Sequence, residues 1–331
     1  MSRIFDRADT TAPWDYVFNL GGETALSQTP ELYRLRSYTL STALAAEAAK
    51  RNCGVFIEVS TGMVYSPTRT PPRKEGDKLK PWLKLAKAKL EAEEALSRIP
   101  GLNLVVLRLA HVYGEYDSGF VAKALCLARV YQEQEREMKW LWTEDLRINT
   151  VWVEDVARAL WRAAEWRSQN RGAVEGGGVS SSRRPSLIGG AGGGKGDDGP
   201  VAGSAVFNIV DRGRTSQGTL ASIISQVFGI KTGFQGSLIS QFAKLNLEHV
   251  VDDLNEDILQ PWADMLARKG ITRPGPLSPF LEKELLKDTD LSLDGSMFER
   301  VCDFKYEREK GLDVQGVKEM VASYEKMGWW P

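Results

Sequence analysis

The stretch GVFIEVSTGMVYS, residues 54–66, sets how the rest of the chain is interpreted. It begins as a near-continuous apolar run, which is typical of a parallel strand covered on both faces. It ends in a Ser-Thr turn followed by Val-Tyr. Two further runs have the same apolar character, DYVFNLG at 15–21 and LNLVVLRLA at 102–110. Together the three runs predict parallel strands of one sheet.

Helical patterns lie between these runs. Residues 32–51 and 79–99 have a helix-forming composition, with apolar positions three to four residues apart, and each pattern leads into a strand. Further strands are expected at 149–155 and 205–211, with a helix over 153–166. Strands alternating with helices in this way predict right-handed crossovers and an α/β fold with a doubly wound, Rossmann-like parallel sheet.

Composition divides the chain into three parts. Residues 172–203 are rich in glycine and serine and almost free of large apolar side chains, so we expect a disordered insertion there. It contains GKGDDG at 194–199, a formal GxGxxG match that we reject because no strand precedes it and two aspartates would repel a phosphate. Residues 1–171 form the predicted Rossmann-like domain. Residues 204–331 supply the last sheet strand and a smaller, mainly helical C-terminal lobe on the substrate side.

Charge and rare residues restrict the class of ligand. The 43 basic and 44 acidic residues nearly cancel, which argues against a nucleic-acid or membrane-surface partner and favours a small molecule. Two histidines are too few for a histidine-rich metal site, so no metal is expected. Three scattered cysteines form no CxxC pair, and there is neither a signal-peptide pattern nor a spanning segment. A cytoplasmic protein is therefore predicted.

Several motifs resemble those of one family. EVSTGMVYS at 58–66 is similar to the strand end of extended short-chain dehydrogenases, the NAD-dependent epimerase/dehydratase family. The resemblance continues in family order through VFNLGGET (17–24), VVLRLAHVYGEYD (105–117), NTVWVEDVARAL (149–160) and VFNIVD (206–211). It implies NAD or NADP as cofactor and a nucleotide sugar or similar hydroxylated metabolite as substrate.

The resemblance also implies roles for individual residues. Thr61 would hydrogen-bond a substrate hydroxyl or keto oxygen, and Lys89 would hold the cofactor ribose. His111, on a strand-end loop, would contact the substrate. The residues expected beside the cofactor are Leu20, Gly21, Gly22 and Lys89.

The chain departs from the family at its catalytic acid. Members carry a tyrosine four residues before the lysine, and that phenol exchanges a proton with the substrate. Here the position is Leu85, and a leucine cannot exchange a proton. The YxxxK match at Tyr306 lies elsewhere in the chain, and Tyr38 stands where the family has a structural asparagine. We therefore expect slow or absent turnover, and the alternative function is a pseudoenzyme that binds a ligand or a protein partner and regulates.

A second departure concerns the front of the family pattern. The run at 15–21 resembles the family's fourth strand, and the Gly-rich half that normally precedes it is not found in this sequence. Such a strand would be an exposed apolar edge. We expect either a shortened version of a longer protein, the interpretation favoured here, or a partner that covers the edge. A homodimer through helices 32–51 and 79–99 is a further expectation, and a scaffold without ligand is the third functional alternative.

Overall fold

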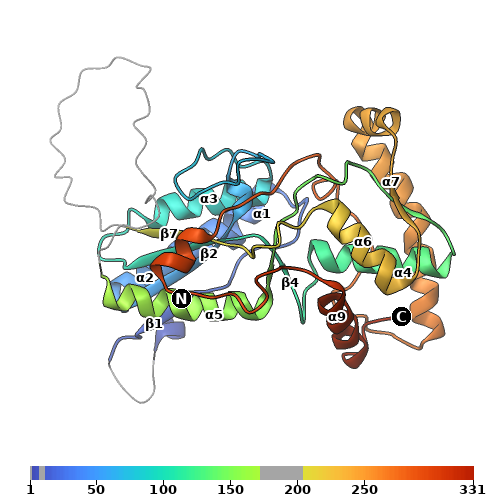
Figure 1. Cartoon of the computed structure of the whole chain (residues 1–331). Helices are drawn as coiled ribbons and strands as arrows, with labels where there is room; N and C mark the ends of the chain where they lie inside the picture. Colours follow the sequence, from blue (N-terminus) through green and yellow to red (C-terminus); the bar gives the residue numbers. More distant parts are fainter. Residues whose placement is uncertain (1, 7–11, 172–203) are drawn as a thin grey trace.

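The computed structural model describes residues 2–6, 12–171 and 204–331. Two lobes lie side by side in Figure 1, a sheet-containing lobe and a helical lobe that carries the C-terminus. The predicted insertion and the GKGDDG match at 194–199 fall outside the described residues.

The first lobe is built on four parallel strands. They are β1 (Tyr16–Asn19), β2 (Val55–Thr61), β3 (Leu104–Leu109) and β7 (Ala205–Ile209), in the order β1-β2-β3-β7. The predicted parallel α/β sheet is confirmed. Within the described residues β1 pairs only with β2 and forms one edge of this sheet.

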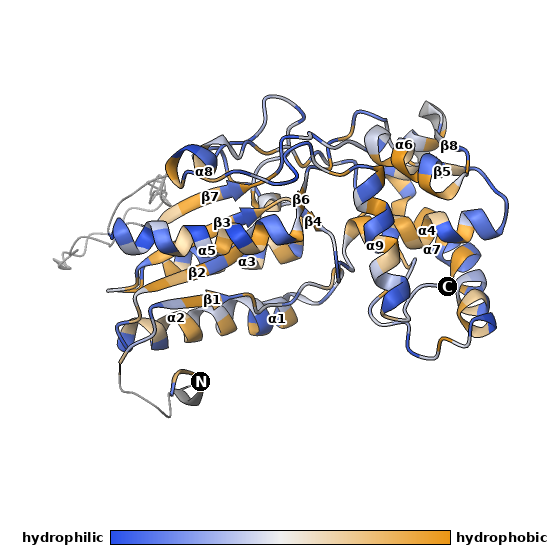
Figure 2. Ribbon diagram, turned by 60° about the horizontal axis from the view of Figure 1, so that its bottom comes forward, coloured by the Kyte–Doolittle hydropathy of each residue, from blue (hydrophilic) through white to orange (hydrophobic). Residues whose placement is uncertain are grey.

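Helices cover both faces of the sheet, which explains why its strands are apolar throughout. Alternate residues such as Phe56 and Val106 pack on one face beneath α2 (Leu40–Lys50) and α3 (Lys84–Leu96). The intervening residues pack on the other face against α5 (Val153–Gln169) and α8 (Ser296–Val301). Figure 2 shows apolar colour running along the strands, whereas the covering helices alternate between polar and apolar residues.

Three predicted elements have different bounds. The helix expected over 32–51 starts as α1 (Pro30–Tyr33), passes through a π-helical segment (Arg34–Thr39) and continues as α2. The helix expected over 79–99 is shorter, because Leu83 is extended and α3 begins only at Lys84. The strand expected over 149–155 is β6 (Thr150–Trp152), which pairs with β4 (His111–Tyr113) rather than with the main sheet.

The second lobe is mainly helical. It contains α4 (Phe120–Glu133), α6 (Gln217–Phe228), α7 (Ser237–Arg268), α9 (Val314–Lys326) and a small pair of strands, β5 (Met138–Trp140) and β8 (Thr232–Phe234). Trp262, Tyr324 and Trp330 are buried together in its core. The aromatic C-terminal sequence therefore closes this lobe.

The two lobes are not continuous in the sequence. Helix α4 precedes the insertion in sequence but packs against α6 and α7, whereas β7 follows the insertion and completes the main sheet. The division at residues 171 and 204 stays a prediction about domains. Short 3-10 turns at Ser2–Phe5 and Gly62–Val64 complete the described elements.

All three cysteines are buried free thiols. Among the described helices, none is both long enough and apolar enough to cross a membrane.

Candidate functional site

The carboxyl ends of β1 and β2 form one rim of the sheet, and Thr61 lies on it. Thr61 is the last residue of β2 and caps the 3-10 turn that follows, because its Oγ1 accepts a hydrogen bond from the Met63 backbone N–H at 3.2 Å. The chain turns sharply here against Leu293, whose Cδ1 would lie 2.4 Å from a Cβ at Gly62. A glycine at position 62 thus fixes the turn that presents the Thr61 hydroxyl.

Lys89 reaches the same rim from α3. Its Nζ donates to the Val59 carbonyl at 2.8 Å and lies 3.6 Å from Glu58 Oε1. An ammonium group has three donors, and the lysine side chain is 11% exposed. Lys89 is therefore held beside the strand ends by a backbone carbonyl and a nearby carboxylate.

Glu58 is the buried acid beneath this lysine. Its carboxylate accepts from Asn19 Nδ2 at 2.6 Å and from Ser41 Oγ at 2.9 Å. Burial raises the pKa of Glu58, although Lys89 and the two hydrogen bonds act in the opposite direction. The group therefore ties β1, α2 and β2 together directly under Lys89.

Of the predicted cofactor residues that follow β1, Gly22 lies beside Lys89. Gly22 has φ of +142°, a backbone conformation that favours glycine, and a Cβ there would lie 3.1 Å from Lys89 Nζ. Gly21 packs toward Leu40, and Leu20 is 65% exposed. The structure thus brings Gly22 and Lys89 together, while Leu20 points to solvent.

His111 stands apart from Lys89, on the side of the second lobe. Its ring stacks on Phe120 with centroids 4.9 Å apart, and it lines a small cavity of about 20 Å³ together with Met63 and Leu83. Burial lowers the pKa of His111 to about 4. The imidazole is therefore neutral near pH 7, so it can accept or donate a hydrogen bond but carries no positive charge at that pH.

Two buried tyrosines of the described residues, Tyr65 and Tyr306, are already used in hydrogen bonds away from position 85. Leu85 is half-buried on α3, one turn before Lys89. Tyr65 accepts a hydrogen bond from Arg108 and donates one to Asn208 Oδ1, both at 2.8 Å, and burial raises its pKa. The Tyr306 oxygen accepts from the Val210 N–H at 3.2 Å inside the core, and Tyr306 is far from α3 in the sequence. The hydroxyl groups of both tyrosines therefore take part in structural hydrogen bonds.

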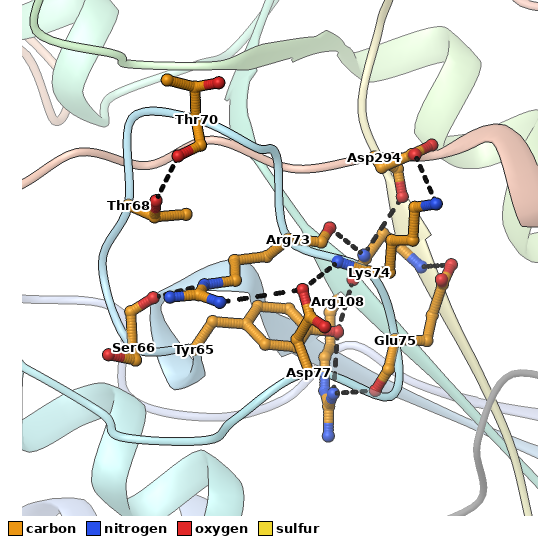
Figure 3. A network of polar contacts seen from close by, with 11 residues as sticks. Tyr65, Ser66, Thr68, Thr70, Arg73, Lys74, Glu75, Asp77, Arg108 and Asp294 are labelled. Atoms are coloured by element: carbon orange, nitrogen blue, oxygen red, sulfur yellow. Dashed lines mark hydrogen bonds and ion pairs between the residues drawn. The ribbon is translucent and has the colours of Figure 1, made fainter.

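A second polar cluster lies behind the rim, and sequence reasoning missed it. Arg108 of β3 makes a two-pronged contact with Glu93 of α3, at 2.6 and 3.1 Å, and also donates to Tyr65. Figure 3 shows Arg108 and Tyr65 beside the 65–77 loop, with Arg73, Lys74 and Glu75 around them. The available signal was a single charge inside an otherwise apolar strand, as at Glu58 in VFIEVST and Arg108 in LVVLRL.

The family comparison agrees with this arrangement. The model of the NAD dependent epimerase/dehydratase family matches residues 4–174, just over half of the chain. The chain belongs to this family. Its resemblance through the motifs at residues 17–24, 58–66 and 105–117 is thereby confirmed. The cofactor of the family, by its own description, is NAD.

Individual relatives are more distant. A dTDP-4-dehydrorhamnose reductase of Aggregatibacter actinomycetemcomitans is 29% identical over 129 residues, which are 38% of this chain and 43% of that protein. The chain thus matches less than half the length of this curated relative. The activity and substrate in the name of this reductase are those of the relative itself.

Solved structures share the fold. A UDP-glucuronic acid 4-epimerase of Bacillus cereus, crystallised with a substrate analogue and NAD, superimposes with a TM-score of 0.60 at 12% identity, covering 98% of this chain and 78% of that one. The UDP-glucose 4-epimerase of Thermotoga maritima gives 0.58 at 18% identity, covering 95% and 78%. WbmG of Bordetella bronchiseptica, in complex with NAD and UDP, gives 0.56 at 13% identity, covering 96% and 74%. At these identities the likeness shows the fold.

The described residues fit one part of a nicotinamide dinucleotide. Lys89 Nζ lies close to the Gly22 backbone, where any Cβ would approach it to 3.1 Å, and its N–H groups are donors of the kind that could hold the hydroxyls of a ribose. No group of three or more metal-ligating side chains occurs in the described ranges.

Proposed function

We propose that this chain binds NAD at the β1–β2 rim, together with a nucleotide sugar or similar hydroxylated metabolite, and turns it over slowly. The observation that carries the proposal is the Lys89 ammonium held beside Gly22 by Val59 O and Glu58, within a fold whose family uses NAD. Nucleotide sugars are suggested by the names of the solved relatives. NAD rather than NADP is proposed because the family is NAD dependent.

The residues divide the work as follows. Lys89 donates hydrogen bonds to ribose hydroxyls, and Thr61 Oγ1 donates to a substrate hydroxyl or keto oxygen. His111, neutral near pH 7, contacts the substrate from the side of the second lobe. Bound NAD would supply the hydride acceptor. The missing part is a group at position 85 that takes the hydroxyl proton, and the loss of such a group lowers a rate by about 10²–10⁴.

The test is the substitution Leu85→Tyr. The phenol would stand one turn before Lys89 on α3. We expect the rate of hydride transfer from UDP-glucose or UDP-glucuronic acid to NAD, monitored by the absorbance of NADH, to rise by about 10²–10⁴-fold. Leu85→Phe is the matched control, because it adds the ring without the hydroxyl. Brisk turnover by the unchanged protein, with no gain from the tyrosine, would show that another residue is the acid.

A regulatory role is the second candidate, and Leu85 is the observation that favours it. A protein that retains Thr61 and Lys89 but lacks the acid can bind a ligand without consuming it. Ligand binding would then stabilise one state of the protein for a partner. Persistent absence of turnover in Leu85→Tyr, combined with measurable NAD binding, supports this candidate over slow catalysis.

Association of the chain is a separate proposal. Helices α2 and α3, which include most of the residues in 32–51 and 79–99, lie on one outer face, and β1 leaves one edge of the described sheet unpaired. Either surface can support a homodimer. Light scattering over a dilution series tests this, and a stable monomer near 36.8 kDa at micromolar concentration contradicts it.

A further inference from the structure

Residues 281–289 cross from the helical lobe to the rim that carries the predicted site, and we call this segment the strap. Both of its ends are fixed. Leu281 exchanges two hydrogen bonds with the Asn255 side chain, both at 2.9 Å, and Leu291, just beyond the other end, donates from its N–H to the Arg147 carbonyl at 2.9 Å. Between these two ends the chain forms turns and bends.

The strap is attached more firmly to the helical lobe than to the sheet. Within the described residues, the contacts with the helical lobe are three ion pairs and one hydrogen bond: Glu282 with Lys123 at 3.2 Å, Lys283 with Glu248 at 2.8 Å, Asp288 with Lys244 at 2.6 Å, and the Leu286 carbonyl with Trp142 Nε1 at 2.7 Å. The strap therefore belongs to the helical lobe.

Two hydrogen bonds of the described chain hold the strap against the sheet lobe. The Glu284 carboxylate accepts from the Ser27 N–H at 2.8 Å, and Lys287 Nζ donates to the Trp82 carbonyl at 3.1 Å. Both are bonds between a charged side chain and a neutral backbone group. If the strap moved with the helical lobe, these two closing bonds would break and its other contacts would be kept.

The closing bonds end on the loops that bear the proposed site. Ser27 lies in the same loop after β1 as Gly22, and Trp82 lies just before α3, which carries Lys89. The strap also lines the small cavity beside His111. It thus covers the substrate side of the rim.

The space under the strap is too small for a sugar. The cavity beside His111 has a volume of about 20 Å³, which is room for one water molecule. An engineered cavity of about 150 Å³ holds a benzene molecule, and a hexose is larger than benzene. A sugar that contacts His111 from this cavity therefore requires the strap to move away from the rim.

We propose that the strap is a lid, closed in this structure by Glu284 and Lys287, which moves with the helical lobe to admit a nucleotide sugar and stays open while the sugar is bound. The inference rests on the proposed function, because it takes the sugar to lie beside His111. A ligand that fits only the open state binds with an apparent affinity that scales with the open fraction. Weakening the closing bonds therefore tightens binding.

The experiment uses the full chain and UDP-glucose as probe, with binding measured by isothermal titration calorimetry. Glu284→Leu and Lys287→Met each remove one closing bond, and we expect the dissociation constant to fall about three- to tenfold. Loss of a residue that holds the sugar itself would raise it. Glu284→Gln keeps an acceptor for the Ser27 N–H and should match the wild type. Lys283→Met, which changes a contact with Glu248 of the helical lobe, is the matched control and should also match it.

Hydrogen exchange of the Ser27 amide reports the state of the lid directly. Without ligand, we expect this amide to exchange faster in Glu284→Leu than in the wild type and in Glu284→Gln. Saturating UDP-glucose should speed its exchange in the wild type, because the bound state is open. Circular dichroism checks that each variant is folded.

The outcomes separate the lid from the proposed function. A dissociation constant that is unchanged or raised in both Glu284→Leu and Lys287→Met overturns the lid, and so does slower exchange of the Ser27 amide with UDP-glucose bound. Either result leaves the proposed function standing, since the wild type still binds a nucleotide sugar. Absence of UDP-glucose binding in the wild type and in every variant overturns both.

Discussion

Two pairs of oppositely charged residues join the same helix to the same sheet, but they differ in the distance between their charged groups. Arg108 and Glu93 meet at 2.6 Å with side chains 2% and 0% exposed. Lys89 and Glu58 stand 3.6 Å apart, and the lysine donates to Val59 O instead. Lys89 and Glu93 are only one helical turn apart on α3. The comparison indicates that the inner pair is structural, whereas the outer lysine is less tightly paired, as the proposed ligand-binding role of Lys89 requires.

The largest expected effect concerns the inner pair. Arg108→Met leaves the Glu93 carboxylate buried without its cation, and we expect the free energy of unfolding to fall by about 3–5 kcal/mol. Chemical denaturation measures it. Arg98→Met, just after the C-terminal end of the same helix, is the matched control, because its side chain is 71% exposed and its loss should change stability by no more than about 0.5 kcal/mol. Equal losses in the two variants would remove the structural role.

A double replacement sharpens this result. Arg108→Met combined with Glu93→Leu removes both charges and leaves apolar groups of similar length. Because no buried carboxylate then stays unpaired, we expect the double variant to be more stable than Arg108→Met alone. A double variant as unstable as the single one would show that packing, and not the ion pair, dominates at this position.

The outer pair should matter less for folding. Lys89→Met leaves Glu58 with its hydrogen bonds from Asn19 and Ser41, so we expect the free energy of unfolding to fall by about 1–3 kcal/mol. The same denaturation experiment measures it beside Arg108→Met. A loss as large as that of Arg108→Met would contradict the distinction between the two pairs.

The pH dependence of the outer pair is the smallest effect. Burial raises the pKa of Glu58, so the folded state holds this proton more tightly than the unfolded state does. The stabilisation is complete below about pH 4.3, the ordinary glutamate value, and is lost as the pH rises toward the raised pKa. Glu58→Gln should flatten stability against pH in this window, and Lys89→Met should steepen it. A flat wild-type profile, unchanged in Glu58→Gln, would contradict the assignment.

The difference between the pairs also shows what the sequence could predict. The apolar runs that became β1, β2, β3 and β7 were readable because strands covered on both faces are apolar at every position. Thr61 and Lys89 were predicted as site residues from the family motifs, and their roles stay predictions. Glu58 and Arg108 were visible as lone charges within strands, but their partners lie on other elements and follow from packing alone.

Three other outcomes depend on packing in the same way. The run at 149–155 has a strand composition, yet β6 pairs with β4 and not with a strand of the main sheet. The residues before Lys84 have helical periodicity but are extended at Leu83. Trp140 and Gln217 are far apart in sequence and line one cavity of the helical lobe only in the folded chain, so no pattern in the sequence indicated that cavity.

The most direct test of the account is the affinity for NAD of the unchanged protein, Lys89→Met and Lys87→Met, measured by isothermal titration calorimetry. Lys87 is the matched control, an exposed lysine on the same helix. Loss of a charged hydrogen-bond donor weakens binding by about 10- to 100-fold. The account predicts that wild type and Lys87→Met bind NAD equally and that Lys89→Met binds it at least tenfold more weakly. Equal affinity in all three proteins, or no NAD binding by the wild type, would contradict the claim that Lys89 is held for a cofactor.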